Sequence, residues 1–271
     1  MRTIAVRTIT GAIYVSLIIS SLVFHPILLG IVIILINYFS TTELNKICSK
    51  LTDQSPVSWV IVNSFFVILT IAILNLPLQP VYIIIPLLAM PVTLLTMIIF
   101  SEIRQPVHYV AFALFGTLYI SVPLILLNLI QQISLEIKIP FALAIFVIIW
   151  TNDTFAYLSG IAFGKHKMLT RVSPLKSWEG FVGGLLMVFP AIFIFYNFFP
   201  AFGLINWLVF GIVTAIAGII GDFSESLIKR SADIKDSGNI LPGHGGMLDR
   251  IDSLLFAIPV IYIYLQIIVK F

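Results

Sequence analysis

Long apolar stretches, separated by short polar or proline-containing breaks, run through the whole chain. They cover approximately residues 9–23, 27–39, 59–76, 81–100, 109–129, 139–161, 179–199, 204–224 and 253–269. A helix needs roughly 20 apolar residues to cross a bilayer core about 30 Å thick. The pattern therefore predicts an all-α, polytopic membrane protein with about nine transmembrane helices.

The first two stretches are shorter than a full span, and the pattern fits three arrangements of them. Residues 9–39 can form one kinked span, a re-entrant pair or two separate helices. Proline ends helices and disfavours α geometry in the residue before it. We therefore expect tight turns at His25–Pro26 and again at residues 76–80.

Composition supports the membrane interpretation. Of 271 residues, 60% are hydrophobic and only 10% are charged, whereas a soluble domain is about 25% charged. A soluble globular protein and a disordered chain are both excluded. The net charge of +3 is too small to indicate a nucleic-acid partner, and we expect none. The single cysteine, Cys48, excludes an internal disulfide and a thiolate metal cluster.

The distribution of basic residues predicts an orientation. With nine spans and the N-terminus inside, the inside segments are 1–8, 40–58, 101–108, 162–178 and 225–252. They contain 13 of the 15 Lys and Arg residues, and the other two are Lys138 and Lys270. This excess of basic residues inside agrees with the positive-inside rule. We therefore expect a multi-pass membrane protein whose N-terminus and these segments face the cytosol. A count of eight spans would move only Arg2 and Arg7, so charge does not separate the two counts.

Ionisable residues are concentrated in the C-terminal half. We expect residues 1–130 to be scaffold helices that contact lipid, and residues 131–271 to be a catalytic membrane region with cytosol-facing loops. Glycine pairs spaced by four, such as Gly180 and Gly184, predict closely packed helices. Such faces permit a homodimer as well as packing within one chain.

The first group of candidate functional residues lies at the end of the apolar stretch 139–161 and in the inside segment that follows it. Asp153 lies near the end of that stretch, where a carboxylate costs about 2.5–3.5 kcal/mol and usually faces a polar cavity; the plainer interpretation is an interfacial charge that reaches water. Ser177 is placed to cap the next helix, and Glu179 favours its first turn. A helix N-terminus beside lysines attracts anions, although these lysines also serve as positive-inside residues.

The inside segment 225–252 has a more specific pattern of polar residues. If the helix over 204–224 continues past Asp222, then Asp222, Ser226 and Lys229 share one face. The following loop, 236–246, contains four glycines, which let backbone N–H groups approach anionic oxygens. We expect Asp249 and Asp252 to open the last helix as a second carboxylate face.

The residue types in these segments narrow the chemistry. Carboxylates without a cysteine or histidine cluster favour Mg²⁺ over zinc. Lysine and arginine beside aspartate favour phosphoryl or nucleotidyl transfer, in which charge neutralisation dominates. No P-loop, kinase-type or serine-hydrolase motif occurs in the sequence.

The stretch from Ser226 to Asp252 resembles the signature of the phosphatidate cytidylyltransferase (CDP-diacylglycerol synthase) family. It reads S-x-IKR-x4-KD-x-G-x2-LP-x-HGGM-x-DRID. The upstream runs DT-x-AY, FGK and SP-x-KS-x-EG are also similar to bacterial members, although threonine is commoner where Ser177 stands. The specific resemblance covers roughly the last 120 residues.

The resemblance implies a membrane enzyme that converts CTP and phosphatidate to CDP-diacylglycerol and pyrophosphate. It implies Mg²⁺ bound by Asp222 and Asp249, and allows a second, monovalent cation such as K⁺ beside it. We expect catalytic roles for Asp222, Asp249, Lys229, Arg230 and His244. We expect substrate contacts from Asp153, Lys165, Ser173, Lys176, Glu179, Ser226, Lys235, Asp236, Gly245, Gly246, Arg250 and Asp252.

Other functions fit parts of the pattern. A CTP-dependent polyprenol or phytol kinase, or a cytidylyltransferase for archaeal ether lipids, would share the frame, but the full signature argues against the kinases. Acids in apolar helices also suit a proton-coupled transporter; here, however, the charges gather at one membrane edge. A non-catalytic scaffold has no need of a loop rich in glycine, histidine and aspartate.

Overall fold

The computed structural model describes residues 2–52, 58–76, 80–100, 103, 105–243 and 245–269, which are predominantly helical. The α-helices are α1 (Arg2–Val23), α2 (Pro26–Thr52), α3 (Ser58–Asn75), α4 (Ile84–Ile99), α5 (Pro106–Gly116), α6 (Val122–Ile137), α7 (Phe141–Phe163), α8 (Trp178–Phe198), α9 (Leu204–Ser231) and α10 (Asp252–Ile268). Shorter helical turns are η1 (Pro80–Ile83), η2 (Thr117–Ser121), η3 (Pro200–Phe202) and η4 (Leu248–Arg250), and the strands are β1 (Lys167–Leu169) and β2 (Ser173–Ser177).

Six of these helical segments are long and apolar enough to cross a membrane. They are Pro26–Leu51, Ser58–Asn75, Pro106–Ile137, Phe141–Phe163, Trp178–Phe198 and Leu204–Ser231. Shorter apolar helices cover Thr8–Val23, Ile84–Ile99 and Asp252–Ile268. Each predicted apolar stretch therefore coincides with a helix, and the prediction of an all-α polytopic membrane protein is confirmed.

The first two apolar stretches form separate helices. α1 ends at Val23 and α2 begins at Pro26, as expected from the His25–Pro26 pair. The Ile27 backbone N–H donates to His25 Nδ1 over 3.2 Å, so the imidazole serves as a cap. Pro26 has no backbone N–H, but an N–H at the first helical position has no acceptor within the helix, so no hydrogen bond is lost. The second expected turn falls partly at residues 77–79, outside the described ranges.

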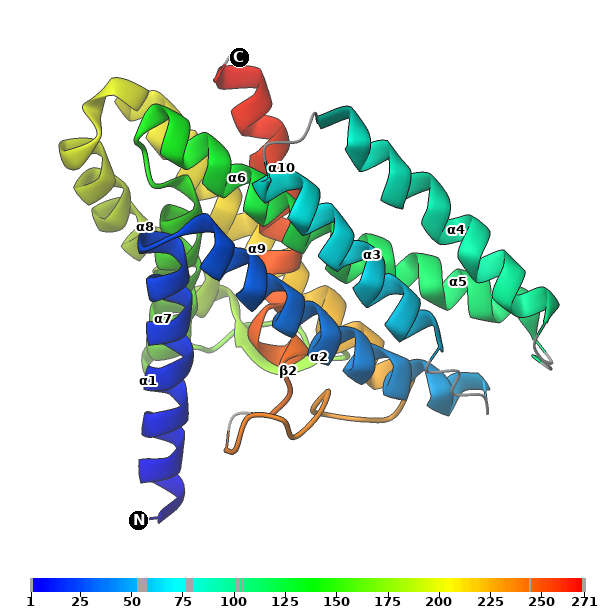
Figure 1. Cartoon of the computed structure of the whole chain (residues 1–271). Helices are drawn as coiled ribbons and strands as arrows, with labels where there is room; N and C mark the ends of the chain where they lie inside the picture. Colours follow the sequence, from blue (N-terminus) through cyan, green and yellow to red (C-terminus); the bar gives the residue numbers. More distant parts are fainter. Residues whose placement is uncertain are drawn as a thin grey trace. The chain divides into compact units, whose positions relative to one another are not determined.

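The chain forms two compact units. The first unit comprises Met1–Gln132 and Ala232–Arg250; Figure 1 shows its helices α2 and α3 side by side. Polar side chains bond within it: Asn63 Nδ2 donates to Ser121 Oγ over 2.8 Å, and Ser121 Oγ lies 2.7 Å from Asn37 Oδ1. Such bonds help to join helices in lipid, where apolar contact alone provides little drive for association.

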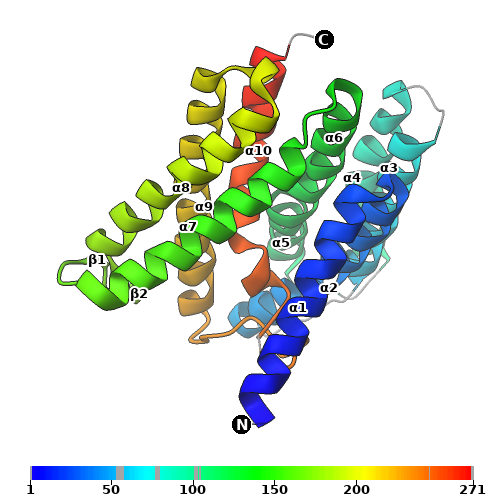
Figure 2. The ribbon, with the colours of Figure 1, turned by 90° about the vertical axis from the view of Figure 1, so that its left-hand side faces the viewer.

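The second unit comprises Ile133–Ser231 and Ile251–Phe271. Its helices α7 and α8 run along each other, with the short antiparallel β1–β2 hairpin at one end (Figure 2). A Cβ on Gly180 would lie 2.7 Å from the Ala156 carbonyl oxygen, and one on Gly184 would lie 2.8 Å from the Asn152 carbonyl oxygen. The predicted packing role of these two glycines is confirmed. The hairpin itself was not predicted.

Candidate active site

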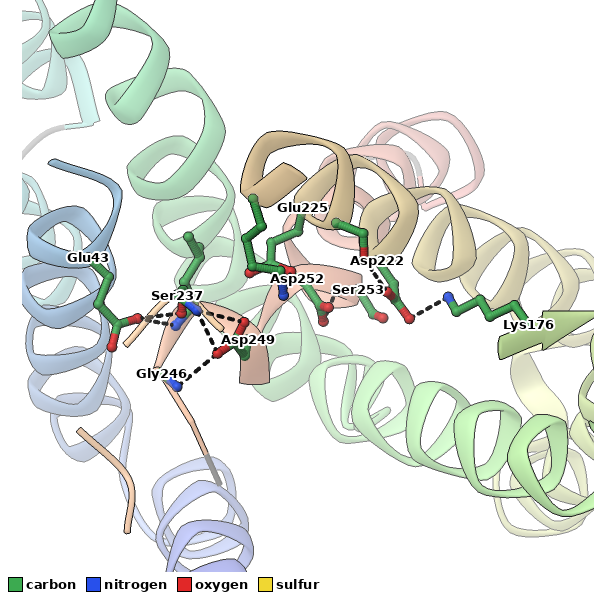
Figure 3. Close-up of polar contacts among 12 residues, drawn as sticks. Glu43, Lys176, Asp222, Glu225, Ser237, Gly246, Asp249, Asp252 and Ser253 are labelled. Atoms are coloured by element: carbon green, nitrogen blue, oxygen red, sulfur yellow. Dashed lines mark hydrogen bonds and ion pairs between the residues drawn. The ribbon is translucent and has the colours of Figure 1, made fainter. Parts of the chain in front are cut away.

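Asp222 is the centre of a polar cluster in the second unit. α9 continues to Ser231, as predicted, and Ser226 Oγ donates to Asp222 Oδ1 over 3.4 Å. Lys176, from the end of β2, forms an ion pair with Asp222 Oδ2 (Figure 3), and both side chains are 30% exposed. The Lys176 ammonium also lies 4.4 Å from the centre of the Phe223 ring. The cluster therefore combines a carboxylate, a hydroxyl and a cation that solvent can reach.

Two further carboxylates extend this cluster. Asp153 of α7 and Asp252 of α10 lie close enough to Asp222 for the three carboxyl groups to influence one another. α9 and α10 approach closely at Gly221, where a Cβ would lie 2.5 Å from the Asp252 carbonyl oxygen. This close packing brings Asp222 and Asp252 together (Figure 3). The second unit thus gathers three of the predicted acids.

Lys229 and Arg230 lie further along α9 in different environments. Lys229 pairs with Glu225, one turn earlier, and their side chains are 12% and 1% exposed. Glu225 was not among the predicted residues, although its i, i+4 spacing to Lys229 is a readable signal for an ion pair. Arg230 is exposed near the end of the helix.

The hairpin that carries Lys176 is fixed at the start of α8. Ser177 Oγ accepts the Gly180 N–H over 3.2 Å, which confirms the predicted cap. Glu179 accepts the backbone N–H of Lys165 over 3.1 Å and lies 2.6 Å from His166 Nδ1. Lys165 is exposed, and Ser173 is half-buried at the start of β2. Glu179 therefore closes the hairpin; its predicted substrate contact stays a prediction.

Asp249 organises the glycine loop of the first unit. Its carboxylate accepts the Ser237 N–H over 3.1 Å and the Gly246 N–H over 2.8 Å (Figure 3). The expectation that Asp249 opens the last helix is wrong, because Asp249 belongs to the separate turn η4 and α10 begins at Asp252. A carboxylate offers about four lone-pair sites, so these bonds are compatible with the predicted metal-binding role.

A pocket of about 720 Å³ opens in this loop, a size typical of small-molecule sites. It is lined by Lys235, Asp236, Asn239, Leu241, Pro242, Gly243, Gly245 and Arg250. The structure thus brings four of the predicted substrate-binding residues together. Gly243 and Gly245 have φ of 77° and 83°, a left-handed conformation that favours glycine. The hydroxyl of Thr10 on α1 donates to the Pro242 carbonyl over 3.2 Å.

Sequence reasoning missed Glu43. This residue of α2 is fully buried in the first unit and contacts the glycine loop (Figure 3). The available signal was an isolated acid within an apolar helix, since such residues usually have a polar partner. The sequence predicts only scaffold and lipid contact for residues 1–130, so this contact corrects that interpretation at Glu43.

The metal site stays a prediction. Within the described ranges, no group of three or more His, Cys, Asp and Glu side chains is arranged to hold a metal. Mg²⁺ commonly uses only one or two carboxylates together with substrate phosphates, and oxygen donors of that kind are present at Asp222. Asp222 belongs to the second unit and Asp249 to the first. His244 lies outside the described residues.

The fold and the polar clusters together define a polytopic membrane protein with features suited to a phosphate-containing substrate. The chain belongs to the cytidylyltransferase family, which matches residues 5–268. It is 34% identical to a phosphatidate cytidylyltransferase of Staphylococcus haemolyticus over 96% of this chain and 98% of that protein. A Staphylococcus aureus protein of the same name is 32% identical over 96% and 98% of the two chains. A Haemophilus influenzae protein of that name is 43% identical over 43% of this chain and 42% of its own length.

Proposed function

We propose that this protein is a phosphatidate cytidylyltransferase, which transfers the cytidylyl group of CTP to phosphatidate. The products are CDP-diacylglycerol and pyrophosphate, and the process served is phospholipid biosynthesis. The observation that supports this most strongly is the near full-length similarity to proteins of that name. The glycine-loop pocket, lined by Lys235 and Arg250, adds a site of suitable size and charge for a nucleotide.

In this reaction a phosphate oxygen of phosphatidate attacks the α-phosphorus of CTP. A new P–O bond forms, the bond from the α-phosphorus to the bridging oxygen breaks, and pyrophosphate leaves with the electron pair. A phosphate monoester has a second pKa of about 6, so the attacking oxyanion exists near neutral pH. No residue is therefore assigned as general base.

The residues of the chain then act by position and charge. Lys235 and Arg250 in the glycine-loop pocket bind the CTP triphosphate, because cations neutralise the charge that accumulates on the leaving pyrophosphate. Lys176 exchanges its pairing with Asp222 for a substrate phosphate when substrate enters. Lys229 is less available for such a contact, because it is nearly buried against Glu225.

Mg²⁺ would be held by Asp222 and Asp249. When bound, it stabilises negative charge on the phosphates. The fit rests on the donor chemistry: Asp222 is partly exposed, and two more carboxylates interact with it electrostatically. Asp249 precedes Asp252 by only three residues in the sequence, which supports its participation. A monovalent cation such as K⁺ beside Asp222 is a further part of the proposal.

The phosphates of both substrates are then bound at the cytosolic face of the inner membrane, while the acyl chains of phosphatidate stay in the bilayer. The distribution of basic residues supports this orientation. A homodimer through glycine-spaced helix faces stays a prediction.

To test this proposal, purified protein in lipid is incubated with CTP labelled at the α- or the γ-phosphate, and the label that enters lipid is measured. We expect the α label to enter lipid only when phosphatidate and Mg²⁺ are both present. Transfer of the γ label would instead indicate a CTP-dependent lipid kinase. Absence of both transfers from folded protein would contradict the proposal.

A further inference from the structure

Glu43 is a buried carboxylate that the proposed reaction does not use. It lies on α2 and is 0% exposed. A buried ionisable group is costly unless hydrogen bonds or an opposite charge compensate for the water it loses. The contacts of Glu43 therefore indicate why an acid is placed there.

Those contacts reach both ends of the glycine loop. Glu43 Oε2 accepts the Ser237 hydroxyl over 3.0 Å and the Leu248 N–H over 2.8 Å, and Oε1 accepts the Met247 N–H over 3.0 Å. Figure 3 shows Ser237 lying between Glu43 and Asp249. One side chain of α2 thus connects the N-terminal end of the loop, at Ser237, to its C-terminal end, at residues 247–248.

Two glycines of the loop make this contact possible. A Cβ on Gly246 would lie 2.6 Å from Glu43 Oε2, and a Cβ on Gly238 would lie 2.8 Å from Glu43 Cδ. Neither distance is available to a real Cβ, so any larger residue would displace the carboxylate or the loop. The residues that line the nucleotide-sized pocket lie between these contact points in the sequence or within two residues of them.

We propose that Glu43 is a positioning residue that holds the loop 237–248 in the conformation that binds CTP. The inference rests on the proposed function, since it concerns the nucleotide pocket of that reaction. Glu43 acts through the Ser237 hydroxyl and two backbone N–H groups of the loop, none of which belongs to a residue that lines the pocket. Its loss should therefore weaken nucleotide binding far more than phosphatidate binding.

The test compares Glu43→Gln with Asn45→Ala, a change two residues further along the same helix. Asn45 is also buried, but its Oδ1 accepts the Trp59 indole N–H over 2.8 Å. Glutamine keeps the size of Glu43 but places an N–H₂ donor against a backbone or hydroxyl donor. We expect Glu43→Gln to raise the KM for CTP about tenfold or more and to change the KM for phosphatidate less than about threefold. Asn45→Ala should lower the melting temperature and leave both KM values near those of the wild type.

A second measurement does not depend on turnover. Amide hydrogen exchange of residues 237–248 should be faster in Glu43→Gln than in Asn45→Ala, because Glu43→Gln weakens hydrogen bonds to the loop, whereas the Asn45 bond described above goes to Trp59 of α3. If Glu43→Gln does not fold, Ser237→Ala removes one of the three bonds and should raise the KM for CTP in the same direction. It should also accelerate exchange of the loop.

The outcomes separate this inference from the proposed function. A wild-type protein without cytidylyl transfer would overturn the proposed function itself. The positioning role alone would be overturned if the wild type is active and Glu43→Gln shows the same KM for CTP and the same loop exchange as Asn45→Ala. If Glu43→Gln does not fold, the same result with Ser237→Ala would overturn it.

Discussion

The two aspartates expected to bind metal have different surroundings. Asp222 pairs with a lysine side chain and accepts a serine hydroxyl. Asp249 accepts backbone N–H groups from two points of one loop. Asp222 is therefore bound by two side chains, whereas Asp249 holds its own loop together through backbone groups. Substitutions at the two positions should accordingly differ in their effect on stability.

The first prediction concerns Asp222→Asn. The change keeps the shape of the side chain but removes its charge, so kcat/KM should fall about a hundredfold or more, the order expected for loss of a strong electrostatic contact. The measurement is the α-label assay on purified protein, with a melting curve to show that the variant folds. Asp233→Asn is the matched control, because Asp233 is exposed and asparagine tolerates its left-handed φ of 54°. Near-normal activity in Asp222→Asn would remove Asp222 from the site.

The second prediction concerns Gly245→Ala. The φ of 83° at Gly245 strains any larger residue, and the added Cβ would lie 2.9 Å from Asp249 Oδ2. We expect a lower melting temperature and a KM for CTP raised about tenfold. Gly203→Ala separates the two effects, since Gly203 has a φ of 82° but its Cβ would meet nothing nearer than 3.8 Å. An equal rise of KM in both variants would contradict a local effect on the loop.

Glycines determine how closely α7 and α8 can pack. The backbone of α8 at Gly180 and Gly184 approaches the carbonyl oxygens of α7 too closely for any side chain. The same pair of helices frames the hairpin, because Glu179 at the start of α8 accepts N–H groups just beyond the end of α7. The position of Lys176 therefore depends on helix packing as well as on its own strand.

The third prediction tests this packing. Gly180→Val should destabilise the protein by about 1–3 kcal/mol through overpacking, because the obstructing atom is a backbone oxygen that cannot rotate away. The melting temperature in detergent measures the effect. Val182→Leu, an enlargement at a half-exposed position of the same helix, should change it little. Equal melting temperatures for wild type and Gly180→Val would show that the helices do not pack this closely.

The orientation of the second unit in the membrane decides which side its polar cluster faces. Cys48 is buried and is therefore a poor reporter of sidedness. Thr170 and Ala201 are exposed and lie in the segments before and after α8. If α8 spans the bilayer, these two positions lie on opposite sides of it.

The fourth prediction uses Thr170→Cys and Ala201→Cys, each in a Cys48→Ala background. A membrane-impermeant maleimide should label position 201 in intact cells, and position 170 only after the cytosolic side is opened. The reason is that the hairpin belongs to the segment 162–178, which the positive-inside rule places in the cytosol. The reverse pattern would invert the orientation and contradict a cytosolic active site.

Local patterns in the sequence were sufficient for much of this structure. The apolar stretches, the break at His25–Pro26, the Ser177 cap and the continuation of α9 beyond Asp222 each depend on residues within a few positions of one another. Hydropathy, proline geometry and capping act over that range, so they can be read without knowledge of the fold. The family signature is likewise a continuous stretch.

Only the tertiary structure assigned partners across long separations. Glu43 meets the loop about 200 residues away, and Asp153, Asp222 and Asp252 come from three different helices of one unit. It also grouped the loop Ala232–Arg250 with the N-terminal helices. Hydropathy places a helix in the membrane but does not say which neighbour it packs against or which face it turns inward. Contacts of this kind therefore emerge only when the helices are assembled.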